Sequence, residues 1–139
     1  MNFLLETCVL SEFTRRSPTD KVVRWIDSHD EESLFLSVIT IGEIQHGIAC
    51  LPDSQRKNDL NQWLNIDLSG RFGKRILTLD AAIMIRWGTL SAKLEEMGKP
   101  MSVMDALLVA TALEYDLVLV TQNITDFQNS GVRITNPWE

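Results

Sequence analysis

Cysteine is scarce in this sequence, with Cys8 and Cys50 the only two among 139 residues. They form no C-x-x-C motif and belong to no cysteine and histidine set with the spacing of zinc ligands. Both a disulfide framework and a cysteine-ligated structural zinc are therefore excluded. We interpret the two cysteines as free packing thiols in a reducing compartment.

Long apolar runs are absent as well. No stretch approaches the roughly 20 uninterrupted apolar residues that span a bilayer. The first five residues are mostly apolar, but they contain no basic residue and are followed at once by Glu6, which is unlike a secretory signal. The sequence predicts no membrane segment and a cytoplasmic location.

Positive charge is also in short supply. Thirteen lysines and arginines stand against 19 aspartates and glutamates, which gives a formal net charge of −6. This balance argues against a protein that holds nucleic acid mainly through a positive field. Chemistry on a nucleic acid would need local basic groups or a bound cation, and the excess of acid also suits a basic protein partner.

Several phosphate-handling motifs are missing. Neither G-x-G-x-x-G nor G-x-x-x-x-G-K-[ST] occurs, and the stretch from Gly70 to Lys74 is too short to replace them. A receiver domain is disfavoured because Asp80, which follows the third expected strand, is better interpreted as a helix cap. A haloacid-dehalogenase-type phosphatase needs Asp-x-Asp, where this chain has Glu6-Thr-Cys8.

What the chain does contain is an alternation of short apolar runs with helical patterns, in a sequence that is 45% hydrophobic. Strands are predicted at residues 3–5, 33–37, 76–79, 117–121 and 132–134. Helices are predicted over residues 9–14, from Ser17-Pro18 onward, from Thr40 onward, and over 54–68, 81–97 and 102–112. This alternation predicts an α/β fold, in which a short parallel sheet of about five strands is flanked by helices within one domain, residues 1–139.

Acidic side chains recur where expected strands end or the next helices begin. They are Glu6, Glu43, Asp105 and Asp126, the last of them beside Asn123. Ligands of open parallel sheets bind outside the carboxyl ends of the strands, so we expect these carboxylates to share one site. Each also has a structural interpretation, because Thr40-x-x-Glu43 and Ser102-x-x-Asp105 fit capping boxes, Asp126 fits a turn, and Glu6 fits a surface acid.

Four carboxylates in one place raise one another's pKa values unless a cation compensates their charge. A ligand set made only of oxygen atoms, without cysteine or histidine, points to Mg²⁺ or Mn²⁺. Such a cation orients a phosphate, activates water and stabilises the leaving oxygen. The sequence therefore predicts metal-dependent phosphodiester hydrolysis.

Four blocks, in order along the chain, carry a family resemblance. They are Leu4–Glu12, Ser37–Glu43, Ser102–Ala112 and Leu119–Phe127. Together they resemble the signature blocks of PIN-domain ribonucleases, above all the VapC-type toxins of bacterial toxin–antitoxin pairs and their FitB-like branch. The resemblance covers essentially the whole chain. It implies a PIN-like three-layer fold in a single domain over residues 1–139, an RNA substrate, Mg²⁺- or Mn²⁺-dependent endonuclease activity, homodimers, and a small DNA-binding antitoxin encoded nearby.

The resemblance also implies roles for individual residues. We assign catalytic and metal-binding roles to Glu6, Glu43, Asp105 and Asp126. We assign supporting roles to Thr7, Ser102, Thr121 and Asn123. Weaker candidates for guiding RNA phosphates, with solvated surface charge as the alternative, are Arg15, Arg16, Arg71, Lys74 and Arg75.

The chain departs from the family pattern in three places. The first acid is usually Asp, where this chain has Glu6; the residue two positions later is usually Asn, where it has Cys8; and the last block usually reads Thr-Arg-Asn, where Gln122 takes the place of Arg. Glu6 occupies a metal-ligand position, and Gln122 removes a cation that would touch phosphate. The alternative to an active nuclease is therefore a catalytically impaired PIN domain that serves as an antitoxin-binding, regulatory module.

Overall fold

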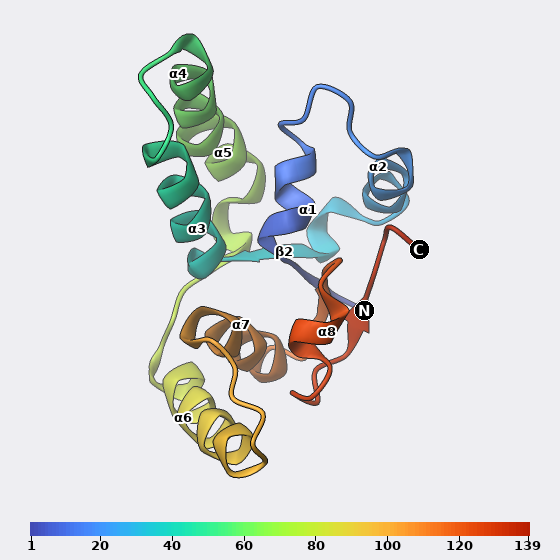
Figure 1. Cartoon of the computed structure of the whole chain (residues 1–139). Coiled ribbons are helices and arrows are strands. Elements are labelled where there is room, and N and C mark those ends of the chain that lie inside the picture. The colour runs from blue at the N-terminus through green and yellow to red at the C-terminus, as the bar shows by residue number, and fades with distance from the viewer.

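The computed structural model describes residues 1–139 and contains a five-stranded sheet in which all neighbouring strands are parallel (Figure 1). The strands are β1 (Phe3–Leu5), β2 (Leu34–Ser37), β3 (Ile76–Leu77), β4 (Val118–Val120) and β5 (Ile134–Thr135). Their order across the sheet is β3-β2-β1-β4-β5. The predicted parallel sheet of five strands flanked by helices is confirmed.

Eight α-helices connect and cover the strands. They are α1 (Thr7–Glu12), α2 (Asp20–Asp27), α3 (Val38–Ala49), α4 (Gln55–Gln62), α5 (Ser69–Phe72), α6 (Ala81–Glu96), α7 (Val103–Glu114) and α8 (Ile124–Phe127). A π-helical segment, Trp63–Leu68, joins α4 to α5, and 3-10 turns cover Glu31–Ser33 and Gly73–Arg75. None of these helices is both long enough and apolar enough to cross a membrane.

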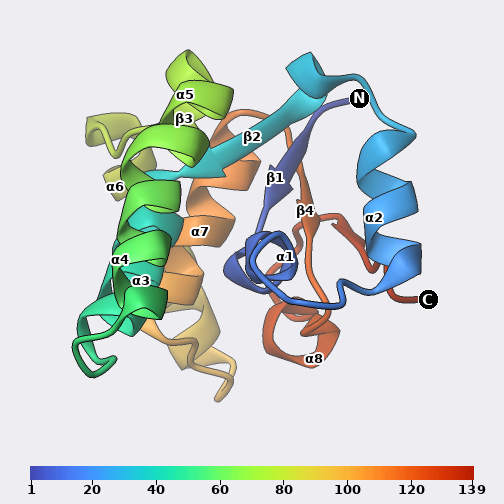
Figure 2. The ribbon, with the colours of Figure 1, turned by 90° about the horizontal axis from the view of Figure 1, so that it is seen from above.

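The helices form one layer on each face of the sheet (Figures 1 and 2). Alternate residues of β1 show the division, because Phe3 and Leu5 belong to one buried cluster and Leu4 belongs to the other. The first cluster joins the sheet to α1, α2, α3 and the α4–α5 segment, and the second joins it to α6, α7 and α8. Side chains along a strand alternate between faces, so burial on both faces makes the strands continuously apolar.

Two predicted helix starts are wrong. Helix α2 begins at Asp20 after Thr19, two residues beyond the expected start at Pro18. Helix α3 begins at Val38, because β2 runs into it without a loop and the Ser37 hydroxyl accepts a hydrogen bond from the Ile39 N–H (3.0 Å). Thr40 is therefore inside α3, and Glu43 lies in the second turn and takes no part in a capping box.

The helix predicted over residues 54–68 extends beyond its expected end. Helical backbone continues from the π-helical segment through α5 to Phe72. Leu64, Leu68 and Phe72 recur at intervals of four residues and are all buried, and this apolar stripe keeps Gly70 inside the helix. Two other predicted caps are confirmed, since Asp80 accepts a hydrogen bond from the Ile83 N–H (2.9 Å) and Ser102 accepts one from the Asp105 N–H (3.2 Å).

Glu12, at the end of α1, is a buried acid that the sequence analysis did not single out. Only 1% of its surface is exposed. Its carboxylate accepts a hydrogen bond from the Thr19 hydroxyl (2.6 Å) and two from the Arg15 guanidinium (3.1 and 3.2 Å). Burial by itself would raise its pKa, but Thr19 and Arg15 outweigh burial and hold the pKa below its usual value. Glu12 thus ties α1 to the segment that leads into α2.

We expect Glu12→Ala to lower the free energy of unfolding by about 1–3 kcal/mol, because it removes a buried carboxylate together with its bonds from Thr19 and Arg15. The exposed acid Glu32 is the matched control, and Glu32→Ala should stay within about 0.5 kcal/mol of the parent. Because the folded-state pKa is lowered, the contribution of Glu12 is complete above the ordinary glutamate pKa of 4.5 and is lost as the pH falls through the folded-state pKa. Urea unfolding of the three proteins at pH 7 and pH 3 tests this, and an equal loss in both variants would contradict it.

Candidate functional site

The candidate site lies at the carboxyl edge of the sheet, where the strand order reverses direction between β1 and β4. Glu6 directly follows β1, and its N–H donates to the Val120 carbonyl of β4 (3.0 Å). Such a switch point leaves a crevice between chain segments that depart to opposite faces of the sheet. The loop after β4 and the starts of α1 and α7 are therefore brought to the same edge.

Glu6 is the N-cap residue of α1. Its carboxylate accepts a hydrogen bond from the Cys8 N–H (2.7 Å), so the side chain folds back toward its own helix. Burial raises the pKa of Glu6, the bond from Cys8 opposes that shift, and the nearby charges of Glu43 and Asp105 raise the pKa further. Glu6 is thus a partly desolvated acid within the electrostatic reach of two others.

Asp105 lies in the first turn of α7 and is half-buried. Burial is also the main cause of its raised pKa, which Ser102 partly offsets by a hydrogen bond and which Glu43 and Asp126 increase by their charge. Of the two reciprocal bonds of a capping box, only the one to the Ser102 hydroxyl is formed. The Asp105 carboxylate therefore does not complete a capping box, and the charges of Glu43 and Asp126 act on it.

Glu43 reaches the edge from α3. Its Oε1 accepts a hydrogen bond from the Thr7 hydroxyl of α1 (2.8 Å), across 36 positions of sequence. Thr121, which is buried after β4, accepts a bond from the Asn123 N–H (3.0 Å) and contacts the Cys8 sulfur (3.7 Å). These bonds fix the loops that carry the acids.

Cys8 is a poor metal ligand in this setting. Burial and the adjacent Glu6 charge raise the pKa of its thiol to about 12, so the thiol stays protonated at neutral pH. Metals bind cysteine as the thiolate. The candidate donors are therefore the carboxylates alone.

The charges of Glu43 and Asp105 raise the pKa of Glu6, and those of Glu43 and Asp126 raise the pKa of Asp105. No three of the protein's His, Cys, Asp and Glu side chains, however, are arranged to hold one ion. Cys8 and Thr7 hold the Glu6 and Glu43 carboxylates, and Asp126 is exposed on α8. The all-oxygen donors suit a hard divalent cation. The bonds from Cys8 and Thr7 each occupy one carboxylate oxygen, of Glu6 and of Glu43, and leave the other oxygen to bind a cation. Their role as ligands stays a prediction.

Two hollows flank Asp105 and its neighbour Met104. One, of about 580 Å³, is formed by the loop between α6 and α7 together with α8 and contains Lys99, Ser102, Asp105 and Asp126. The other, of about 640 Å³, lies toward α3 and contains Thr7, Glu43, His46 and Met104. Both volumes fall in the range of small-molecule sites, roughly 300–1,000 Å³. Each hollow contains at least one of the four predicted acids.

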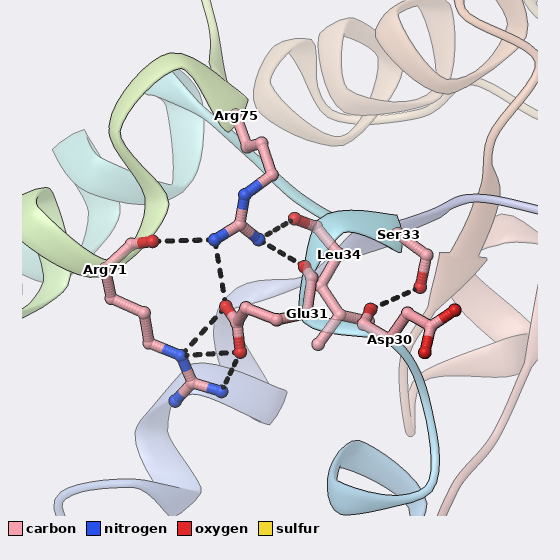
Figure 3. Close-up of polar contacts among 6 residues, drawn as sticks. All are labelled: Asp30, Glu31, Ser33, Leu34, Arg71 and Arg75. Carbon is pink, nitrogen blue, oxygen red and sulfur yellow. Dashed lines mark hydrogen bonds and ion pairs between the residues drawn. The ribbon is translucent and has the colours of Figure 1, made fainter.

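None of the five predicted RNA-guiding residues lines these two hollows. Figure 3 shows Arg71 and Arg75 converging on Glu31, with Arg71 bidentate at 2.8–3.2 Å and Arg75 also bound to the Leu34 carbonyl (2.7 Å). Arg15 is paired with Glu12. These three arginines stabilise local structure, which favours the surface-charge interpretation.

The remaining two of that group, Arg16 and Lys74, are exposed and form no ion pair. Lys99 is the basic residue beside the acids, and the sequence analysis missed it. The available signal was its position just before the Ser102–Asp105 cap.

Comparison with known proteins matches residues 3–129 to the PIN domain. Plasmid stability protein StbB of Pseudomonas syringae is 35% identical over 136 residues, with 98% of each chain covered. Toxin FitB of Neisseria gonorrhoeae is 33% identical, with 97% of each covered, and VapC ribonuclease Y4jK of Sinorhizobium fredii is 30% identical, with 98% of this chain and 97% of the relative covered.

A solved structure supports the same relationship. The crystal structure of FitAcB from Neisseria gonorrhoeae contains a chain that is 32% identical, covers 99% of both chains, and superimposes with a TM-score of 0.92. The sheet order and the flanking helices described above are therefore those of a known fold. The chain belongs to the PIN domain family.

Proposed function

We propose that this chain is a metal-dependent endoribonuclease that acts as the toxin of a toxin–antitoxin pair. The observation that carries the proposal is that Glu6, Glu43, Asp105 and Asp126 lie at the carboxyl edge of a PIN-domain sheet, where Asp105 and Asp126 line one hollow and Thr7 joins α1 to Glu43. Relatives of similar length named as a toxin and as a VapC ribonuclease support it. RNA is the substrate, and its phosphodiester bond is the one hydrolysed.

The four acids would hold Mg²⁺ or Mn²⁺. When bound, the cation supplies charge stabilisation at the phosphate and activates water for attack. The chain's own residues position the ligands: Thr7 orients Glu43, and Ser102 fixes the first turn of α7, which carries Asp105. Carboxylates bind a cation only when they are deprotonated. Because the pKa values of Glu6 and Asp105 are raised, activity should begin to fall at a higher pH than it would with ordinary carboxylates.

The proposed partner is a small antitoxin that binds DNA and is encoded nearby. A solved complex of FitAB with a DNA fragment, whose matched chain is 31% identical to this one, supports it. The net charge of −6 and the acid cluster suit a basic side chain from that partner. We also propose a homodimer, a single PIN domain over residues 1–139, and a cytoplasmic location.

A second candidate function is a catalytically impaired, antitoxin-binding module. The fold-back of Glu6 onto the Cys8 N–H and the lack of a preformed three-ligand group favour it. Both candidate functions include the antitoxin partner, and they differ in whether the chain cleaves RNA. A single assay of the purified chain separates them.

The assay is cleavage of structured RNA in MgCl₂, MnCl₂ or EDTA, with and without the product of the neighbouring gene. The proposed function requires cleavage that EDTA abolishes and the partner suppresses. Partner binding without cleavage in either metal would select the impaired module. A chain that neither binds the partner nor cleaves RNA would overturn both candidate functions.

A further inference from the structure

RNA is a polyanion, so an acidic protein that binds it needs cations beside its catalytic carboxylates. Thirteen basic residues are available. Six of them are committed to ion pairs with acids of the chain, namely Arg15, Lys57, Arg71, Arg75, Arg86 and Arg133. The seven without an ion pair are Arg16, Lys21, Arg24, Arg56, Lys74, Lys93 and Lys99.

Lys99 alone among these seven lines a hollow that contains candidate catalytic acids. It shares that hollow with Asp105 and Asp126, and no ion pair joins it to either of them. The hollow on the α3 side of Asp105 contains His46 but no lysine or arginine. Lys99 is therefore the one lysine or arginine that shares a hollow with any of the four acids.

The backbone at Lys99 is fixed by the way α6 ends. Gly98 adopts a φ of +71°, and its N–H donates to the Glu95 carbonyl (3.0 Å), while the Lys99 N–H donates to the Leu94 carbonyl (2.9 Å). These two bonds form a Schellman motif, which requires a residue at positive φ and so favours glycine. Pro100 follows and restricts the backbone further. The stem of Lys99 thus starts from a rigid point, and its ammonium group stays free to bind.

The other walls of the hollow suit a nucleotide strand. Ser102, Thr125 and Asn129 line it with hydroxyl and amide groups, and the hollow is open beside Asp105. An RNA strand whose scissile phosphate lies at the acids places a neighbouring phosphate in this hollow. An ammonium group there offsets the repulsion between that phosphate and Asp126.

We propose that Lys99 binds the RNA phosphate next to the scissile one and so positions the strand across Asp105. This inference rests on the proposed function, because it assumes an RNA substrate at the acid cluster. Lys99 is a positioning residue, not a metal ligand. Its loss should weaken RNA binding and leave cation binding unchanged.

The test compares Lys99→Ala with Lys93→Ala, which removes another unpaired lysine, on α6 outside the hollow. Lys99→Arg is the conservative variant. RNA affinity is measured by anisotropy with a single-stranded oligoribonucleotide in EDTA over a KCl series, and Mn²⁺ affinity is measured by calorimetry. We expect Lys99→Ala to weaken RNA binding roughly tenfold. It should also reduce the slope of log K against log[salt] by about 0.7, the value for one lost contact to a single strand.

Lys99→Arg should restore both quantities, and Lys93→Ala should match the parent. All four proteins should bind Mn²⁺ equally. Equal RNA affinity and slope for the two alanine variants would overturn the inference, as would a matching loss of Mn²⁺ affinity in Lys99→Ala, which would indicate a damaged site.

Separate outcomes distinguish the inference from the proposed function. Lys99-dependent RNA binding in a parent that never cleaves RNA would overturn the nuclease and support the Lys99 contact. Cleavage by the parent with no effect of Lys99→Ala on binding would do the reverse. A parent that binds no RNA would overturn both.

Discussion

Asp105→Asn should leave the protein folded while it removes divalent-metal binding and RNA cleavage. Asparagine has the same shape, but it lacks the negative charge that a hard cation requires. The helix cap survives, because the Ser102 hydroxyl accepts its bond from the backbone N–H of residue 105 and not from the side chain. We expect the free energy of unfolding to change by no more than about 1 kcal/mol.

The direction of that change follows from the raised pKa of Asp105. A carboxyl whose pKa is higher in the folded than in the unfolded state makes stability fall as the pH rises from the ordinary aspartate pKa, 3.8, to the folded-state pKa. At neutral pH the full penalty is present in the metal-free parent. Asparagine removes it, so the metal-free variant should be as stable as the parent or more so.

Calorimetric Mn²⁺ titration, single-turnover cleavage and urea unfolding of the metal-free proteins test this set of expectations. Asp67→Asn is the matched control, because Asp67 is exposed on the π-helical segment, far in sequence from the four predicted metal ligands. The control should bind Mn²⁺ as the parent does. Equal Mn²⁺ affinity in parent and Asp105→Asn would remove Asp105 from the metal site.

The sheet and the edge that carries the acids were predictable, because both depend on patterns of neighbouring residues. Continuous apolar runs identify buried parallel strands, and an acid directly after a strand must lie at the carboxyl edge. This reasoning located β1, β4 and Glu6 correctly. It also identified Ser102 as the cap of α7 from its spacing to Asp105.

Contacts between distant parts of the chain were beyond such reasoning. The hydrogen bond between Thr7 and Glu43 joins two helices. Glu31 is bound by Arg71 and Arg75, which lie 40 and 44 positions further along the chain. No pattern of neighbouring residues in the sequence predicts either of these contacts. The place of Lys99 in the hollow with Asp126 likewise depends on how α8 packs beside the loop between α6 and α7.

The predicted start of α3 was wrong for a different reason. A Ser/Thr-x-x-acid pattern identifies a cap only where the chain is free to begin a helix, and α3 begins directly from β2 at Val38. Glu43 was therefore expected in the first turn of α3, whereas it lies in the second turn. Its predicted place at the site did not depend on the cap, which is why an incorrect local structure led to the same edge of the sheet.

Glu6→Asp should raise RNA cleavage by roughly ten- to a thousandfold, or about 1.4–4 kcal/mol of barrier. The longer Glu6 side chain folds back, and its carboxylate caps α1 through the Cys8 N–H (2.7 Å). Mg²⁺ demands near-ideal octahedral geometry at about 2.0–2.1 Å, and misplacing a group by about 1 Å costs on the order of a hundredfold in rate. Aspartate is itself a preferred N-cap, so the shorter acid keeps the helix start while its carboxylate lies nearer the backbone.

Single-turnover cleavage by parent and Glu6→Asp, each in Mg²⁺ and in Mn²⁺, measures the effect. Mn²⁺ should rescue the parent more than the variant, because it is less strict in its geometry than Mg²⁺. Glu6→Gln is the control, since it keeps the length of the side chain and an oxygen for the cap but removes the charge, and it should be no faster than the parent. A Glu6→Asp variant with parental rates in both metals would mean that residue 6 is not a ligand, or that the site tolerates the longer side chain. The carboxylates of Glu43, Asp105 and Asp126 would then have to hold the cation without it.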